Sequence, residues 1–268
     1  MPTIRVRRYG TSGPLIALLH GGPGAPGYLA PVARRLAEDF QVLEPFQRGA
    51  GDERLTVSHH VTDLHELLQP HGGDSRPAIV GHSWGAMLAL AYGALHSDSI
   101  GAIVLVSCGT FDPASRERMT DIREQRMGDT LKGRAARIME RYPTNPDARL
   151  KAMGRLYQVI DSVKLIPHKD ETDAFDARAH QESWEDMVRL QEEGRYPAEF
   201  SAIRTPVLML HGSADPHPGQ MIRGVLAPHL PQLEYHEWER CGHYPWLEEA
   251  VHQSFYEVLR DWLTRQYG

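Results

Sequence analysis

A serine lies between two glycines at residues 81–85, in the stretch Gly-His-Ser-Trp-Gly. Small and branched apolar residues precede it and a run rich in Ala, Leu and Met follows, which predicts a short buried strand, a tight turn and a helix. A serine on such a turn is held in a strained backbone conformation that requires small residues two positions away on either side. The helix N-terminus would place backbone N–H groups where negative charge develops in acyl transfer. Ser83 is therefore a candidate nucleophile, and an ordinary turn serine is the alternative.

A serine hydroxyl needs a base, and the chain contains 15 histidines, so position has to select one. His243 follows the last expected strand and precedes the last expected helix, where the carboxyl edge of a sheet would present it. Asp215 also follows a strand end and would orient the imidazole, although an Asp before Pro216 is equally typical of a turn. The chain order Ser83, Asp215, His243 is the order expected of a serine nucleophile on an α/β sheet, and it predicts a catalytic triad.

A second glycine cluster, Leu-Leu-His-Gly-Gly-Pro-Gly-Ala-Pro-Gly at residues 18–27, also follows an expected strand. It predicts half of an oxyanion hole, in which the N–H of Gly22, with Gly21 as the alternative, joins that of Trp84. Gly-Pro pairs also mark plain turns. The stretch lacks the Gly-Lys-Ser/Thr ending of a phosphate loop. His20 is expected to hold the loop in shape rather than to act in catalysis.

The composition narrows the class of protein. A formal net charge of −6, with no basic stripe, argues against a nucleic-acid partner. No apolar run approaches the roughly 18 residues that a membrane helix needs, so no membrane partner is expected. Cys108 and Cys241 lie far apart and predict no disulfide framework, and no apolar segment follows the basic N-terminus. A cytoplasmic enzyme without cofactor or metal is expected, and the oligomeric state is left open.

Short apolar runs alternate with helical patterns at both ends of the chain, which predicts βαβ units and a mostly parallel sheet flanked by helices. The expected strands are residues 15–20, 40–45, 77–82, 101–107, 205–212 and 233–238, and the expected helices are 29–39, 56–71 and 248–266. Between 109 and 204 strand signals vanish and helical stretches appear at 112–127, where Asp112 is a candidate N-cap before Pro113, and at 145–163. The sequence predicts an α/β core of residues 1–108 and 205–268 with an inserted helical cap, 109–204.

These motifs resemble those of the α/β-hydrolase superfamily over residues 1–108 and 205–268. His-Gly-Gly-Pro-Gly at 20–24 is similar to the proline iminopeptidase branch, as is Phe-Gln-Arg-Gly-Ala-Gly-Asp at 46–52. Phe46 and Asp52 replace that branch's Asp and Ser, and the elbow reads Gly-His-Ser as in many esterases. The resemblance implies the fold and the triad, and for that branch it implies aminopeptidase action with acidic cap residues binding the free amine.

Residues 170–193 carry nine acidic residues and two arginines, a net charge of −7 within a chain of −6. Such a surface would attract a cationic amine, and Glu182 and Glu185 are the candidate contacts. The alternative is a solvated helix face opposite the apolar residues Trp184, Met187 and Val188. Trp84, beside the nucleophile, is also expected to be a wall of an apolar acyl pocket.

Three functions are compatible with these residues. The first is a serine hydrolase that cleaves an ester or amide bond of a small substrate through an acyl-enzyme. The second is an aminopeptidase of the proline iminopeptidase type, acting on short peptides. The third is a non-catalytic ligand-binding member of the fold, since fold does not fix function. The hydrolase is favoured because no member of the triad has been lost.

Overall fold

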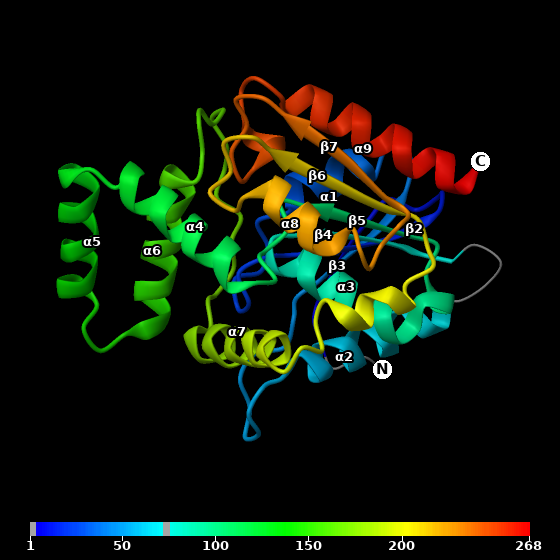
Figure 1. Ribbon diagram of the computed structural model, residues 1–268, viewed down its shortest axis with the longest axis horizontal. Coiled ribbons are helices and arrows are strands. Elements are labelled where there is room, and N and C mark those ends of the chain that lie inside the picture. Colours follow the sequence, from blue (N-terminus) through cyan, green and yellow to red (C-terminus); the bar gives the residue numbers. More distant parts are fainter. Residues whose placement is uncertain (1–3, 72–75) are drawn as a thin grey trace.

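The computed structural model describes residues 4–71 and 76–268. Within these ranges seven strands form one sheet in the order β1-β3-β2-β4-β5-β6-β7 (Figure 1). Only β1 is antiparallel to its neighbour, β3; the other adjacent pairs are parallel. The strands are β1 (Val6–Tyr9), β2 (Leu15–Leu19), β3 (Gln41–Pro45), β4 (Ala78–His82), β5 (Ala102–Val106), β6 (Val207–Gly212) and β7 (Leu233–Trp238).

The mostly parallel α/β sheet predicted from the sequence is confirmed, including all six expected strands. β1 was not predicted. Its residues Val-Arg-Arg-Tyr pair with β3 at the edge of the sheet and are only partly buried. A four-residue strand of this kind carries no continuous apolar run that would reveal it.

Alternate residues of the central strands enter different apolar clusters on the two faces of the sheet. Ile79 of β4 packs in one cluster, which the helices α2 (Val57–Leu68), α3 (Trp84–His96) and α8 (Gly219–Leu226) complete. Val80 packs in the other, which α1 (Ala30–Leu36) and α9 (His252–Tyr267) complete. Because side chains of a strand point alternately to its two faces, burial on both sides produces the continuous apolar runs seen in the sequence.

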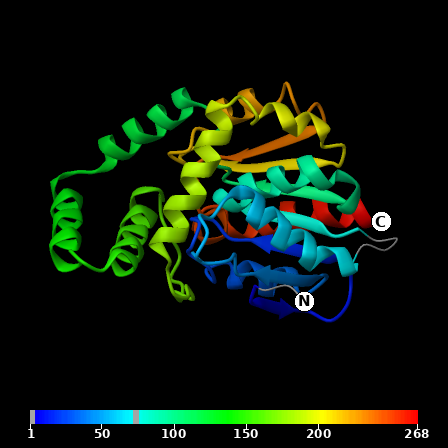
Figure 2. The same ribbon diagram turned by 90° about the horizontal axis from the view of Figure 1, so that it is seen from below.

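Four helices connect β5 to β6, and the structure places them at one end of the sheet (Figures 1 and 2). They are α4 (Pro113–Arg126), α5 (Asp129–Arg141), α6 (Pro146–Ile160) and α7 (Ala177–Glu192). Asp112 caps α4 by accepting a hydrogen bond from the Ser115 N–H at 2.9 Å, as the sequence predicts. Asn145 caps α6 in the same way. We call α4–α6, residues 113–160, the arm, because in Figure 2 these helices extend beyond the sheet.

α7 lies across the end of the sheet and behaves differently from the arm. Met187 and Leu190 of α7 join the apolar cluster that contains α2 and α3, whereas no residue of α5 is buried. The division into a core and a cap stays a prediction, and the core's first range, 1–108, includes residues 1–3 and 72–75, which lie outside the described ranges. In the described part of the chain, no helix is both long and apolar enough to cross a bilayer.

Candidate active site

Ser83 occupies the turn between β4 and α3 with φ 55° and ψ −116°, a region that non-glycine residues rarely enter. Its N–H donates to the Val106 carbonyl of the neighbouring strand at 2.9 Å, which fixes the turn to the sheet. A Cβ on Gly81 would lie 2.2 Å from the Gly85 carbonyl oxygen, and one on Gly85 would lie 2.2 Å from that of Leu19. Both glycines are thus sterically required for this presentation of Ser83.

Asp215 and His243 follow β6 and β7 at the same carboxyl edge of the sheet, and their side chains meet. The Nδ1 of His243 lies 2.7 Å from Oδ2 of Asp215, and both residues are buried. Burial alone would raise the pKa of Asp215, but the adjacent His243 and His217 hold that pKa well below its usual range. The carboxylate is therefore ionised and fixes the orientation of the imidazole.

Ser83 and His243 line one cavity of about 710 Å³, which lies between the sheet edge, the arm and α7. Ser83 Oγ has no hydrogen-bonded partner among the described residues, so the hydroxyl is not held in an inactive contact. Serine–histidine contacts often tighten only when substrate binds. The cavity size suits a small organic substrate.

The backbone N–H groups of Gly22 and Trp84, near Ser83, have no acceptor within the described ranges. Both residues line the cavity, and Gly22 has the positive φ of 46°. The Gly21 N–H, by contrast, donates to the Tyr28 hydroxyl at 2.6 Å. Of the two glycines singled out in the sequence, Gly22 is therefore the one with an N–H left for an oxyanion.

Trp84 is buried and also lines the cavity, and its indole N–H donates to the Gln47 side chain at 2.8 Å. The Gln47 backbone N–H in turn donates to Nε2 of His20, so His20 carries its proton on Nδ1, which lies 3.0 Å from the Gly21 carbonyl. Burial lowers the pKa of His20 to about 4. His20 is thus a neutral imidazole whose hydrogen bonds hold the glycine loop in its conformation.

His82, the variable residue before Ser83, connects the glycine loop to the His243 loop. Its Nε2 lies 2.9 Å from the His243 carbonyl and must donate, so its Nδ1 accepts from the Tyr28 hydroxyl at 2.6 Å. Tyr28 in turn accepts the Gly21 N–H. Burial, followed by the nearby His243, lowers the pKa of His82 well below its usual range, which keeps this chain of hydrogen bonds in one tautomer.

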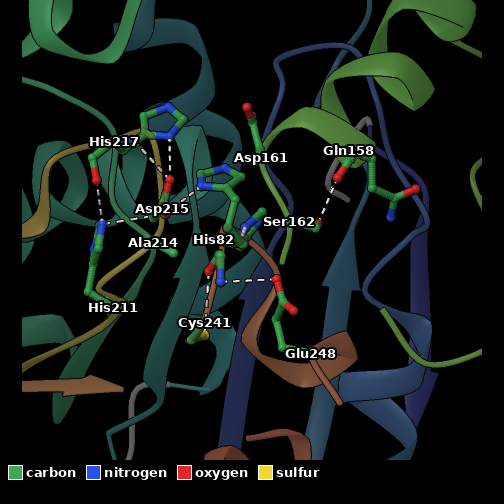
Figure 3. Close-up of polar contacts among 12 residues, drawn as sticks. His82, Gln158, Asp161, Ser162, His211, Ala214, Asp215, His217, Cys241 and Glu248 are labelled. Carbon is green, nitrogen blue, oxygen red and sulfur yellow. Dashed lines mark hydrogen bonds and ion pairs between the residues drawn. The ribbon is translucent and has the colours of Figure 1, made fainter. Parts of the chain in front are cut away.

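His217 and His211, which were not predicted from the sequence, lie on either side of Asp215 (Figure 3). His243 is its third imidazole neighbour. Oδ1 of Asp215 accepts from the backbone N–H of His217 at 2.9 Å and lies 3.0 Å from its Nδ1. The ring of His217 stacks on that of His243 with centroids 4.2 Å apart. Burial, followed by His243, lowers the pKa of His217 to about 4. An imidazole two residues after a candidate acid, in the same loop, was the available signal.

Asp215, His217 and His243 also form a group whose ligand atoms lie within 4.8 Å of one another, close enough for a metal ion. In the structure both Nδ1 atoms are already at hydrogen-bond distance from the carboxylate. A metal bound there would displace the contact that orients His243, so the geometry favours acid–base chemistry over metal binding.

Glu248, which sequence reasoning also missed, joins the His243 loop to the stretch after α6. Its Oε1 accepts from the N–H groups of Gly242 at 3.0 Å and Val163 at 2.8 Å, and its Oε2 accepts from that of Lys164 at 2.8 Å. The His243 N–H donates to the Asp161 carbonyl at 2.8 Å. We call this set of contacts the seam; Figure 3 shows Glu248 and Asp161 near Asp215.

The acidic stretch 170–193 docks onto the core. Glu182 accepts from the Leu55 N–H at 2.8 Å and pairs with Arg178, and Glu185 pairs with Arg54. Neither glutamate is among the described residues that line the cavity. The structure thus brings Ser83, Asp215, His243, Gly22 and Trp84 to one edge of the sheet and leaves Glu182 and Glu185 elsewhere. These carboxylates contact Leu55, Arg178 and Arg54, and a role for either of them in binding an amine stays a prediction.

Comparison with known proteins agrees with this geometry. The crystal structure of VinJ is 20% identical, with a TM-score of 0.71, over 99% of this chain and 97% of that one. Proline iminopeptidase of Lactobacillus crispatus is 26% identical over 93% of this chain and 90% of its own length. "Probable aminopeptidase YbaC" of Bacillus subtilis is 36% identical over 29% of this chain, and the match spans only 28% of that protein.

Several of the curated relatives are matched over less than half of their length. A family model, by contrast, covers nearly the whole of this chain: that of the alpha/beta hydrolase family matches residues 16–253. With the sheet order, the strained turn at its carboxyl edge and the adjacent acid–histidine pair, this match places the chain in the alpha/beta hydrolase family, near its proline iminopeptidase-like members.

Proposed function

We propose that the protein is a serine hydrolase that cleaves an ester or amide bond of a small substrate through an acyl-enzyme. The observation that carries the proposal is that a strained Ser83, whose hydroxyl has no hydrogen-bonded partner among the described residues, and a buried Asp215–His243 pair converge on one cavity. Membership of a hydrolase family supports it.

In the first half-reaction Ser83 Oγ attacks the substrate carbonyl carbon and His243 Nε2 takes the hydroxyl proton. The tetrahedral oxyanion accepts hydrogen bonds from the N–H groups of Gly22 and Trp84, which have no other acceptor among the described residues. The imidazolium then protonates the leaving alcohol or amine as the carbonyl re-forms, leaving the acyl group on Ser83. Asp215, ionised throughout, stabilises the imidazolium.

In the second half-reaction a water molecule attacks the acyl-enzyme. His243 takes one of its protons, the same two N–H groups bind the second oxyanion, and the proton is returned to Ser83 Oγ as the acid leaves. The hydrogen bonds from His82 to the His243 carbonyl and from His243 N–H to Asp161 hold the base in place through both steps.

A fluorophosphonate probe with adduct mapping by mass spectrometry tests the nucleophile. We expect a single adduct on Ser83, none on the Ser83→Ala variant, and normal labelling of Ser213→Ala, which removes an exposed hydroxyl in the Asp215 loop. Labelling of another residue, or none at all, would contradict the proposal. An unlabelled protein that binds small molecules tightly would instead favour the non-catalytic alternative.

Proline iminopeptidase action is the second candidate, favoured by the nearly full-length match to the L. crispatus enzyme. Prolyl and alanyl arylamides, assayed with free and with acetylated amines, separate it from general ester and amide hydrolysis. Equal turnover of the free and blocked substrates would rule out the aminopeptidase. Strict dependence on the free amine would establish it.

A further inference from the structure

The cavity beside Ser83 has a charge opposite to that of the whole chain. The chain carries a net −6, yet five Lys and Arg residues line the cavity against three Asp and Glu residues. The basic residues all come from the arm or from the segment directly after it: Arg123, Arg134, Lys151, Arg155 and Lys169. The arm therefore adds cations to the site that the core loops build.

Each carboxylate in the lining is already paired with an arginine. Asp161 pairs with Arg123, Asp170 with Arg155, and Glu171 with Arg34, which lies outside the lining. Arg134, Lys151 and Lys169, in contrast, have no carboxylate partner among the described residues. The pairing leaves the cavity with an excess of unneutralised positive charge.

Arg123 is the cation that the fold holds most firmly. Its Nε and Nη2 donate to the two oxygens of buried Asp161 at 2.9 and 2.5 Å, and its guanidinium lies 4.9 Å from the centre of the Tyr157 ring. The Nη1 end has no acceptor within the described ranges, and 22% of the side chain is exposed. The backbone carbonyl of Asp161 accepts a hydrogen bond from the N–H of His243. Asp161 therefore contacts both Arg123 and the proposed catalytic base.

We infer that the enzyme acts on acyl substrates that carry a second, anionic group, a carboxylate, which binds at the free end of Arg123 while the ester or amide carbonyl lies at Ser83. Apolar residues that also line the cavity, among them Met119, Met153 and Phe175, would surround a hydrocarbon spacer. Lys151 and Arg134 add longer-range attraction. The substrate class is thus a half-ester or half-amide of a dicarboxylic acid. This inference rests on the proposed function.

A matched pair of esters tests it: p-nitrophenyl hydrogen adipate and p-nitrophenyl methyl adipate, which differ in one charge. After subtraction of the rate with Ser83→Ala, we expect kcat/KM to favour the anionic ester by about 10-fold or more, as for a charge-assisted hydrogen bond in a half-buried site. A cationic analogue, p-nitrophenyl 6-trimethylammoniohexanoate, should be the poorest of the three.

Arg123→Lys keeps a cation beside Asp161 and removes the guanidinium end, so it should abolish most of the preference while leaving turnover of the neutral ester measurable. The double variant Lys151→Met/Arg134→Met should lower the preference by about 3-fold, consistent with half-exposed and exposed charges. Its matched control is Lys132→Met/Arg137→Met, also on the arm but absent from the described lining, which should leave the preference unchanged.

The outcomes separate this inference from the proposed function. If neither ester is hydrolysed and the fluorophosphonate does not label Ser83, the proposed function fails. If the neutral or cationic ester is hydrolysed as well as the anionic one while Ser83 is labelled, only the anionic subsite is overturned. A preference that Arg123→Lys leaves intact would also overturn it.

Discussion

The loops at the carboxyl edge of the sheet and the helices between β5 and β6 are held in place by different kinds of interaction. The edge loops are largely buried and are fixed by hydrogen bonds to imidazoles and carboxylates of low exposure, and the contacts of the turn maintain the strained backbone of Ser83. The arm is largely exposed, and α5 buries no residue at all. The neighbouring helix α7 is attached to the core in three ways: by an ion pair, by a carboxylate that accepts a backbone N–H hydrogen bond, and by apolar contacts.

The edge loops and the arm should differ in how well they tolerate substitution. A group that is buried and paired cannot lose its partner without a large penalty, because the remaining group stays desolvated. An exposed ion pair contributes little, because water screens it. Changes at the edge loops should therefore abolish the chemistry, and changes on the arm should alter only which substrate is used.

The largest effect is expected from Asp215→Asn. The amide would present an N–H to His243 Nδ1 or leave its tautomer unfixed, and we expect kcat to fall by about 10⁴-fold with little change in fold. Steady-state kinetics on an activated ester measures this. Asp170→Asn, on an exposed pair with Arg155, is the control from the segment that follows the arm. A loss below about 10-fold for Asp215→Asn would mean that another group orients the base.

The second effect concerns pH. Burial lowers the pKa of His20 to about 4, of His60 to about 3 and of His217 to about 4, against about 6.5 in the unfolded chain. Above pH 6.5 both states are neutral; as pH falls, only the unfolded state takes up protons, so the free energy of unfolding falls. The expected loss is about 2 kcal/mol per histidine by pH 5.

Urea unfolding at several pH values measures this dependence. The His60→Gln variant should show a shallower dependence on pH, because its unfolded state takes up one proton fewer. A free energy of unfolding that stays constant from pH 7 to pH 5 would contradict the neutral, buried state assigned to these imidazoles.

An intermediate effect is expected at the seam. Both carboxylate oxygens of Glu248 accept backbone N–H hydrogen bonds in the native protein. Glu248→Gln replaces one of these oxygens by an NH₂ group, which can only donate, so at least one of the three hydrogen bonds is lost. We expect kcat to fall by about 10-fold with a smaller change in KM, because the loop that carries His243 moves. Glu249→Gln, on an exposed pair with Lys164, is the matched control, and equal effects from both would show that the seam does not position the base.

The smallest effect is expected from Arg54→Gln, which removes the exposed partner of Glu185. The free energy of unfolding should change by no more than about 0.5 kcal/mol. Asp186→Asn should have a larger effect, because Asp186 is buried and accepts the Val57 N–H at the start of α2 at 2.8 Å. Thermal unfolding should rank Asp186→Asn as clearly the more damaging; the reverse order would contradict the account of how α7 is attached.

The sequence predicted the sheet and the residues at its edge because local patterns report them. Continuous apolar runs indicate strands that are buried on both faces. The glycines on either side of Ser83 indicate, within five residues, a turn that has no room for larger side chains. Asp215 and His243 could be selected because strand ends meet at one edge. Arg123, Glu248 and the pairing of His217 escaped because they depend on contacts between distant segments, such as Glu248 with Val163. The acidic stretch was likewise interpreted without its partners, Arg34 and Arg54, which lie far away in the chain.

The seam has a consequence for anyone who exchanges specificity between relatives of this protein. Cutting the chain at residues 109 and 204 would transplant Asp161, Val163 and Lys164 together with the helices, and the recipient's histidine loop would then meet foreign backbone donors and acceptors. A chimera that exchanges only α5 and α6, residues 129–160, keeps those contacts and the Arg123–Asp161 pair native while replacing Arg134 and Lys151. For this fold, the useful crossover point therefore lies before residue 161, so that the hydrogen bonds that hold His243, the proposed base, stay within one parent.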